Sequence, residues 1–210
     1  MNKFEQLKEG IFRLKIPFDN IYTSVFLLHN KEGTILVDSA SSDNDAKEFI
    51  LPALKEINVI PNYIICSHLH SDHSGGINEL LRSFENTTVG LIDKSIVFKN
   101  KILHLNDGDI LLNQYMILNL KGHTDDSIGI LDLNTKALLS FDSLQQNGVG
   151  KYKTLVADKS EYINSINRLV KMDINTVICS HDYDPYGCMI EGKENILRLY
   201  KICEETVNDK

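Results

Sequence analysis

The sequence predicts an α/β protein in which stacked sheets are flanked by helices. Short apolar segments of strand length alternate with longer amphipathic segments, and strands followed by helices occur in two successive rounds. No linker-like or low-complexity stretch divides the chain. A chain of 210 residues is long enough to bury most of its apolar surface. We therefore expect a single domain over residues 1–210.

The composition is that of an ordinary globular protein, with 42% hydrophobic and 24% charged residues. A formal net charge of −7 gives no indication of binding to nucleic acid or to an anionic membrane. The N-terminal residues lack the apolar core of a signal peptide, and no apolar run reaches the length of a membrane span. The four cysteines show no CxxC spacing, so a disulfide framework is not expected. The expected location is the cytoplasm, and the sequence leaves a homo-oligomer open.

The first half of the chain predicts strands on both sides of one long helix. The expected strands are residues 11–16, 22–29, 34–37 and 63–66, and the expected helices are residues 43–57 and 76–84. Residues 17–20 would form the turn between the first two strands. Asp43 is the expected N-cap of the first helix, and Pro52 would bend that helix or delay its start.

The second half is richer in strands. The expected strands are residues 88–92, 102–105, 110–120, 127–133, 137–141 and 176–179, and the expected helices are residues 160–172 and 191–207. Turn-forming residues at 106–108 and at 134–135 separate neighbouring strands. The helix over residues 160–172 is amphipathic, because Ile163, Ile166 and Leu169 share one face.

Two strand-like segments have nearly the same sequence. Residues 62–68 read NYIICSH, and residues 175–181 read NTVICSH. One interpretation is coincidence between two apolar strands. The other is a duplicated half-fold that sends two strand ends to a single site. Cys66 and Cys179, two residues before the histidines, are expected to be small buried side chains.

Five of the seven histidines belong to a pattern with aspartates. The segment His68-Leu-His70-Ser-Asp72-His73 follows an expected strand and precedes an expected helix. The hexapeptide HxHxDH arises by chance in only roughly one sequence in a thousand of this composition. In an extended segment, residues i and i+2 point the same way, so His68 and His70 can bind one ion. Asp72 and His73 lie further along the loop and can reach a second ion.

Three more candidate ligands lie at strand ends. His123 and His181 each follow a strand, and Asp142 ends one. They can therefore converge with the first four candidates on one sheet edge. Seven candidates exceed the number that one ion needs, so two ions are expected, and the two oxygens of Asp142 could bridge them. Imidazole and carboxylate donors without thiolate fit zinc, iron or manganese.

The sequence resembles the metallo-β-lactamase-fold metallo-hydrolases. The resemblance runs through residues 34–38, 67–76, 120–127, 138–142 and 178–181, and it covers nearly the whole chain. It implies an αβ/βα four-layer sandwich of two mixed sheets flanked by helices, with the metals at one edge. It assigns His68, His70 and His123 to the first ion, Asp72, His73 and His181 to the second, and Asp142 to both. It also implies that Asp38 lies behind the ligands and supports their loop.

The residue at position 142 points to a branch of that family. Aspartate at this position is similar to the glyoxalase II, lactonase and phosphodiesterase branches, whereas zinc β-lactamases have cysteine. Other positions depart from the family pattern: Asp125-Asp126 stands where Pro-Gly is usual, and Phe141 and Ser180 stand where glycine is common. The segment His181-Asp182-Tyr183 is similar to the His-Glu-Tyr of glyoxalase II, whose tyrosine contacts glutathione.

The resemblance and the ligand set together predict a dinuclear metal hydrolase. A hydroxide between two divalent ions would attack the carbonyl carbon of an ester, thioester or lactone. Zinc is the expected metal, and iron and manganese are the alternatives. Asp72 and Asp142 are the expected catalytic carboxylates, and Tyr183 and Tyr152 are candidates for contact with a small-molecule substrate. No nucleic-acid or membrane partner is expected. An iron-dependent persulfide dioxygenase-like enzyme, a small-molecule phosphodiesterase and a non-catalytic metal-dependent sensor stay open as alternatives.

Overall fold

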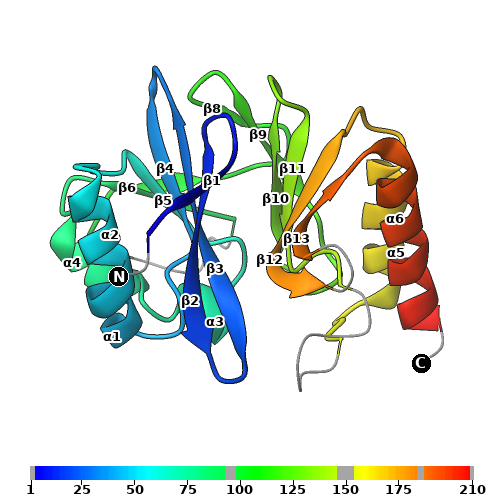
Figure 1. Ribbon diagram of the computed structural model, residues 1–210, viewed down its shortest axis with the longest axis horizontal. Helices are drawn as coiled ribbons and strands as arrows, with labels where there is room; N and C mark the ends of the chain where they lie inside the picture. The colour runs from blue at the N-terminus through cyan, green and yellow to red at the C-terminus, as the bar shows by residue number, and fades with distance from the viewer. Residues whose placement is uncertain (1–2, 93–97, 146–153, 184–186, 209–210) are drawn as a thin grey trace. The chain divides into compact units, whose positions relative to one another are not determined.

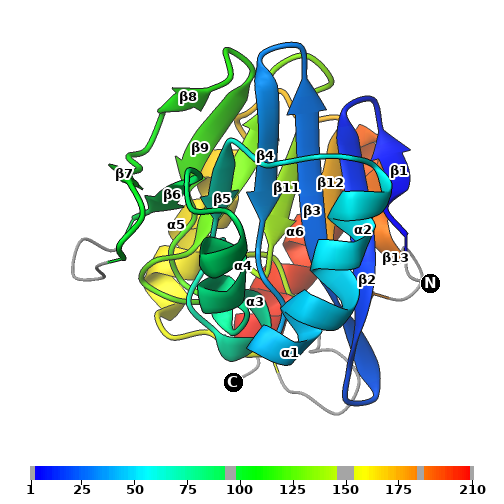
Figure 2. The ribbon, with the colours of Figure 1, turned by 90° about the vertical axis from the view of Figure 1, so that its left-hand side faces the viewer.

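The computed structural model describes residues 3–92, 98–145, 154–183 and 187–208 (Figure 1). The chain forms two compact units, Met1–Asn106 and Asp107–Lys210. Each unit consists of one mixed sheet with helices against one of its faces (Figures 1 and 2). In the described ranges, none of the helices combines the length and the apolar character that crossing a membrane would require.

The first unit is built on a seven-stranded sheet whose strands follow the order of the sequence. Its strands are β1 (Glu5–Lys8), β2 (Ile11–Phe18), β3 (Ile21–Asn30), β4 (Gly33–Val37), β5 (Tyr63–Ile65), β6 (Thr88–Leu91) and β7 (Ile102–His104). Strands β1 to β4 form an antiparallel meander, and β4 to β7 are parallel. Because β4 and β5 are parallel neighbours, the residues that follow them lie at the same edge of the sheet. The hydrogen bond from Asp38 N to Ile65 O, 2.8 Å long, joins the two strand ends.

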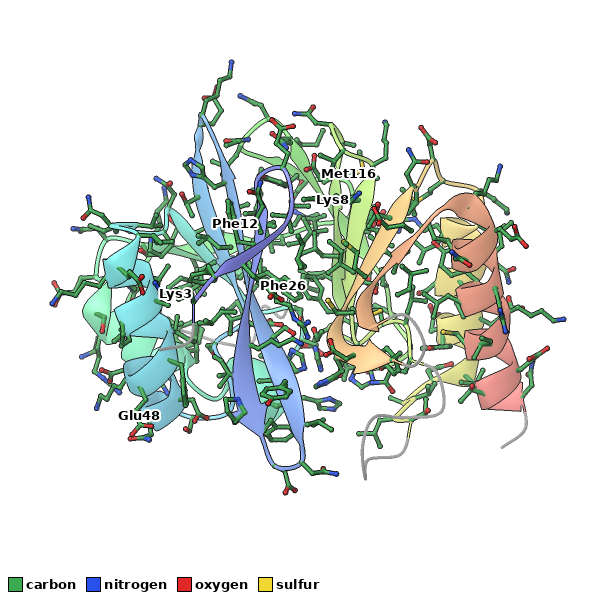
Figure 3. The ribbon with its side chains drawn as sticks, in the orientation of Figure 1. Lys3, Lys8, Phe12, Phe26, Glu48 and Met116 are labelled. Atoms are coloured by element: carbon green, nitrogen blue, oxygen red, sulfur yellow. The ribbon has the colours of Figure 1, made fainter. Side chains whose placement is uncertain are left out.

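Helices cover one face of this sheet. They are α1 (Asp43–Asp45), the π-helical segment η1 (Ala46–Ile50), α2 (Leu51–Glu56), α3 (Ser71–Ser74) and α4 (Ile77–Ser83). Figure 2 shows α1, α2 and α4 lying against the strands, where apolar residues such as Leu36, Ile64 and Leu80 form the core. Side chains alternate across the sheet, so Phe12 packs against this core while Phe26 of the neighbouring strand belongs to the opposite face (Figure 3).

The predicted helix over residues 43–57 is interrupted by a π turn. The N–H of Leu51 donates to Ala46 O, five residues back, and α2 then begins with Pro52 in its first turn. Pro52 has no N–H to continue the α-helical hydrogen bonds, and the change in their spacing falls directly before it. The N-cap is Ser42 and not the expected Asp43, since the Ser42 hydroxyl accepts the N–H of Asp45.

The second unit is built on a six-stranded sheet in the order β13-β12-β11-β10-β9-β8. Its strands are β8 (Ile110–Leu111), β9 (Tyr115–Asn119), β10 (Ile128–Asp132), β11 (Ala137–Phe141), β12 (Thr176–Tyr183) and β13 (Gly187–Glu191). Among these described strands, β11 and β12 pair in parallel and the other neighbours pair antiparallel. Helices α5 (Lys159–Leu169) and α6 (Lys193–Asn208) cover one face (Figure 1). Their apolar sides meet residues such as Leu138 and Val177 in a second core.

The strand prediction is wrong in three places. The single strand expected over residues 110–120 is the hairpin β8–β9, which turns at Leu112 and Asn113 with φ of 48° and 55°. Apolar residues lie on both sides of the turn, and within residues 110–118 only Asn113 and Gln114 interrupt them, so the segment resembles one long strand in the sequence. Strands β1 and β13 were not expected, because each is a short edge strand with few buried side chains.

The two units share a chain topology around the repeated segments. In the first unit an antiparallel pair, β3–β4, leads through helices to β5, which is parallel to β4. In the second unit the antiparallel pair β10–β11 leads through α5 to β12, which is parallel to β11. One copy of the Cys-Ser-His sequence directly follows β5, and the other lies within β12. The common topology favours duplication over coincidence.

Candidate metal centre

The histidine-rich loop of the first unit begins where β5 ends. His68 and His73 are buried, and His70 and Asp72 are partly exposed. The short helix α3 carries Asp72 and His73. Both the N–H and the hydroxyl of Ser39 donate to the carbonyl oxygen of His73, at 2.7 and 3.0 Å. The residues after β4 therefore hold the loop in place.

A buried carboxylate, Asp38, organises this loop. It accepts hydrogen bonds from Ser67 N (2.7 Å), from the Ser67 hydroxyl (2.9 Å) and from His73 Nδ1 (2.7 Å). Burial raises the pKa of the Asp38 carboxyl above its ordinary value, and the contacts with His73 and Ser67 act in the opposite direction. The bond from His73 fixes the ring so that Nδ1 carries the proton and Nε2 carries the lone pair.

The same carboxylate reaches a second histidine through Ser67. Because the Ser67 hydroxyl donates to Asp38, its oxygen can accept from Nδ1 of His68, 3.1 Å away. The ring of His68 is thereby oriented in the same manner as that of His73. Both rings use Nδ1 for a protein hydrogen bond, and both keep Nε2 as a metal donor.

The remaining distances fit metal ligation. His68 Nε2 lies 3.1 Å from His70 Nδ1, and His73 Nε2 lies 3.3 Å from Asp72 Oδ2. Two donors at the usual zinc–nitrogen distance from one tetrahedral ion are themselves about 3.3 Å apart. The four residues therefore form two pairs, each with the spacing of ligands that share an ion.

The second unit holds a separate group of three candidate ligands. Asp142 follows β11, His181 lies in β12, and His123 lies in the loop between β9 and β10. All three are buried. Asp142 Oδ2 is 3.4 Å from His181 Nε2 and 3.8 Å from His123 Nε2. Asp142 is therefore close enough to each histidine to share an ion with it.

His123 is held by the chain that leads into α5. Its Nδ1 donates to Leu155 O at 2.7 Å, which leaves the lone pair on Nε2. Gly122 allows the close approach, because a Cβ there would lie 2.3 Å from Tyr162 Cα, and its φ is +126°. Phe141, which precedes Asp142, has φ of 50°, a conformation that glycine adopts more easily. The glycine common at this position in the family therefore has a backbone reason.

The seven predicted ligands all lie in the described residues, four in the first unit and three in the second. Tyr183 is 3% exposed and packs in the core of the second unit. Its burial raises the pKa of the phenol well above its ordinary value, with a further contribution from the Asp142 charge. Tyr152 lies outside the described residues. Sequence reasoning missed Ser67 and Gln145, whose contacts depend on tertiary structure.

Comparison with known proteins shows the family. Residues 19–181 match the metallo-beta-lactamase superfamily. The chain belongs to this superfamily, and it has the corresponding fold of two mixed sheets flanked by helices. The solved structure of a metallo-β-lactamase from Pseudomonas aeruginosa in its mono-zinc form is similar with a TM-score of 0.75, at 17% identity over 98% of this chain and 94% of that chain. The family and fold predicted from the sequence are thus confirmed.

Two curated relatives are each named hydroxyacylglutathione hydrolase. The protein from Francisella tularensis subsp. novicida is 28% identical over 151 residues, which are 70% of this chain and 58% of the relative. The protein from Aliivibrio salmonicida is 28% identical over 188 residues, which are 84% of this chain and 70% of the relative. The chain thus spans 58% of the length of the first of these relatives.

Proposed function

We propose that this chain is a metal-dependent hydrolase that cleaves a carbonyl bond in a small molecule, with a thioester, ester or lactone as substrate. We also propose that the enzyme uses two divalent ions and that zinc is the first candidate for both. His68, His70 and His123 would hold one ion, Asp72, His73 and His181 the other, and Asp142 both. The two units would then work together as a single domain.

One observation carries the proposal: three buried histidines have Nδ1 hydrogen-bonded to an oxygen of the protein. These are His68 to Ser67, His73 to Asp38, and His123 to Leu155. Each ring therefore has a lone pair on Nε2, and each Nε2 lies near another nitrogen or carboxylate donor. Protein oxygens behind the ring and further donors in front of it are the usual environment of a metal-binding imidazole.

When bound, divalent ions lower the pKa of a coordinated water toward neutrality and polarise the carbonyl that is attacked. The residues of the chain provide the charge and the geometry. Asp72 and Asp142 contribute carboxylates, and Asp38 keeps the rings of His68 and His73 in one orientation. The chain does not need a thiol nucleophile, and its thiols are unsuited to the role. Cys179 and Cys203 are buried, and burial raises the pKa of the Cys203 thiol to about 12.

The relatives favour a thioester as the first substrate to test. Their name, hydroxyacylglutathione hydrolase, describes hydrolysis of a glutathione thioester. The aspartate at position 142 agrees with that branch of the family. Esters and lactones stay in the proposal, because their carbonyl groups undergo the same attack.

The test uses the full chain, stripped of metal with a chelator and reloaded with zinc, manganese or iron(II). We expect hydrolysis of at least one thioester, ester or lactone from a small-molecule panel with the reloaded protein and none with the stripped protein. Metal content per chain is measured in parallel. Reloaded protein that hydrolyses none of the panel would contradict the proposal. Oxygen consumption with a persulfide would indicate the iron-dependent alternative.

A further inference from the structure

The side chain of Gln145 connects two of the candidate ligands of the second unit. Gln145 lies three residues after Asp142, in the chain that follows β11, and it is 6% exposed. Its Nε2 donates to Asp142 Oδ2 at 3.3 Å. Its Oε1 accepts the N–H of Leu155 at 3.0 Å. The carbonyl oxygen of Leu155 in turn accepts the Nδ1 proton of His123.

These contacts fix which end of the amide faces the carboxylate. A backbone N–H can only donate, so the atom of Gln145 that faces Leu155 N must be the oxygen. The amide nitrogen therefore faces Asp142 and donates to it. The result is a continuous path of hydrogen bonds from Asp142 through Gln145 and Leu155 to His123.

The backbone of Gln145 is anchored as firmly as its side chain. Its N–H donates to the hydroxyl of Tyr162 at 2.8 Å, and that hydroxyl donates to Gln145 O at 3.2 Å. Tyr162 is fully buried on α5. The amide thus extends from a rigid support, as a group must if it is to hold others in position.

We propose that Gln145 is a positioning residue that sets the orientation of both Asp142 and His123 toward the metal. The proposal rests on the proposed function only in so far as the chain binds metal. As a neutral donor, the amide uses part of the acceptor capacity of Asp142 Oδ2 without changing the charge of the carboxylate. This contact fixes the orientation of the Asp142 carboxylate, so its remaining lone pairs can face the metal. The same glutamine holds the His123 ring through the main chain of Leu155. Mutation of a residue that hydrogen-bonds to a metal ligand typically lowers metal affinity about 10–100-fold.

The test substitutes Gln145→Met, which keeps the length of the side chain and removes its polar atoms. The chain offers a matched control in Gln114→Met. Gln114 Nε2 donates to Asp132 Oδ1 at 2.9 Å, and Asp132 is fully buried in the same unit but belongs to no ligand group. Both changes remove a glutamine–aspartate hydrogen bond, but only one removes a contact to a candidate ligand.

Zinc affinity is measured by competition with a chromophoric chelator, and cobalt(II) loaded into each protein reports ligand geometry through its visible absorption. We expect Gln145→Met to bind zinc about 10–100-fold more weakly than the wild type and to change the cobalt spectrum. Gln114→Met should match the wild type in both. Equal affinity and an unchanged spectrum in Gln145→Met would overturn the proposal, as would an equal loss of affinity in Gln114→Met.

If Gln145→Met does not fold, Gln145→Asn replaces it. Its amide is one methylene shorter and cannot reach Asp142 and Leu155 together, so weaker zinc binding and a changed cobalt spectrum are again expected, and wild-type values would overturn the proposal. Affinity and spectrum do not depend on turnover. Wild-type protein that binds zinc and hydrolyses nothing would contradict the proposed function, whereas the comparison of the variants would still decide the role of Gln145.

Discussion

At the scale of single residues, one buried carboxylate orients two histidines. Asp38 accepts from His73 directly and reaches His68 through the hydroxyl of Ser67. The cost of burying this charge is offset by three hydrogen-bond donors. Ser67 matters because its hydroxyl both donates and accepts, which alanine cannot do.

We expect Ser67→Ala to weaken zinc binding by about tenfold, because the ring of His68 loses the acceptor that orients it. The loss in folding free energy should be about 2 kcal/mol, because two hydrogen bonds of about 1 kcal/mol each are removed. Ser140→Ala is a matched control, since Ser140 is a buried serine whose hydroxyl donates to the main-chain oxygen of Ile178. Chelator competition and chemical denaturation measure the two effects. Zinc affinity that falls equally in both variants would count against the role of Ser67.

Asp142→Asn tests the ligand proposed to bind both ions. Asp142 Oδ2 lies 3.4 Å from His181 Nε2 and 3.8 Å from His123 Nε2. An amide is a weaker metal ligand than a carboxylate, so we expect one ion fewer per chain. Turnover should fall on the order of 100-fold, because a catalytic metal supplies several kcal/mol of transition-state stabilisation. Metal analysis and initial rates provide the readout, and two bound ions with the wild-type rate would refute the assignment.

At the scale of elements, the ligand loop depends on a close approach between two backbone segments. A Cβ at Gly75 would lie 2.1 Å from Ser41 O, and one at Gly76 would lie 2.2 Å from Ser39 O. The residues after β4 therefore pass directly over the junction of α3 and α4. Since Ser39 also hydrogen-bonds to His73 O, this contact determines where α3 places its two ligands.

We expect Gly76→Ala to lower the free energy of unfolding by about 2–3 kcal/mol, because the added methyl group meets backbone that must move. Zinc affinity should fall with it, since Ser39 would be displaced from His73. Gly108→Ala is the control: its φ is +86° but nothing lies within 4 Å of the added atom, so only backbone strain of about 1 kcal/mol is expected, without an effect on zinc. Denaturant titration and chelator competition distinguish the two. Wild-type zinc affinity in Gly76→Ala would contradict this account of the loop.

At the scale of the whole molecule, the topology shared by the two units places an aspartate at the end of the corresponding strand in each unit. The two aspartates make different contacts. Asp38 follows β4, and Asp142 follows β11, each beside a parallel strand that leads to Cys-Ser-His. In the first unit the carboxylate binds Nδ1 of a histidine and lies behind it. In the second unit the carboxylate faces Nε2 of two histidines. The repeat in the sequence therefore predicts where each aspartate lies in its unit. Whether the aspartate faces Nδ1 or Nε2 of a histidine determines whether it supports a ligand or is itself a candidate ligand.

The sequence was sufficient for the parts of this molecule that depend on local pattern. Alternating apolar residues predicted most strands, and the density of histidine and aspartate in residues 68–73 predicted the candidate ligands. The turn at Leu112 and Asn113 was missed, because Asn113 alone favours a turn there and apolar residues lie on both sides. The path from Asp142 to His123 through Gln145 could not be predicted either, since it joins segments whose contact is created only by folding.

Metal removal should affect the stability of both units together, because the proposal takes ligands for each ion from both. A ligand that binds only the folded state, at one hundred times its dissociation constant, adds about 2.7 kcal/mol of stability. We therefore expect zinc to raise the midpoint of thermal unfolding and the chelator EDTA to lower it. Hydrogen exchange followed by mass spectrometry should show slower exchange with zinc in peptides from β5 and from β12 alike.

Protection confined to one unit would contradict both the shared ions and the single domain. Two separate thermal transitions, of which only one responds to zinc, would contradict them as well. Asp142→Asn provides the internal control, since it removes a ligand proposed to belong to both ions and should reduce the zinc-dependent protection in both units.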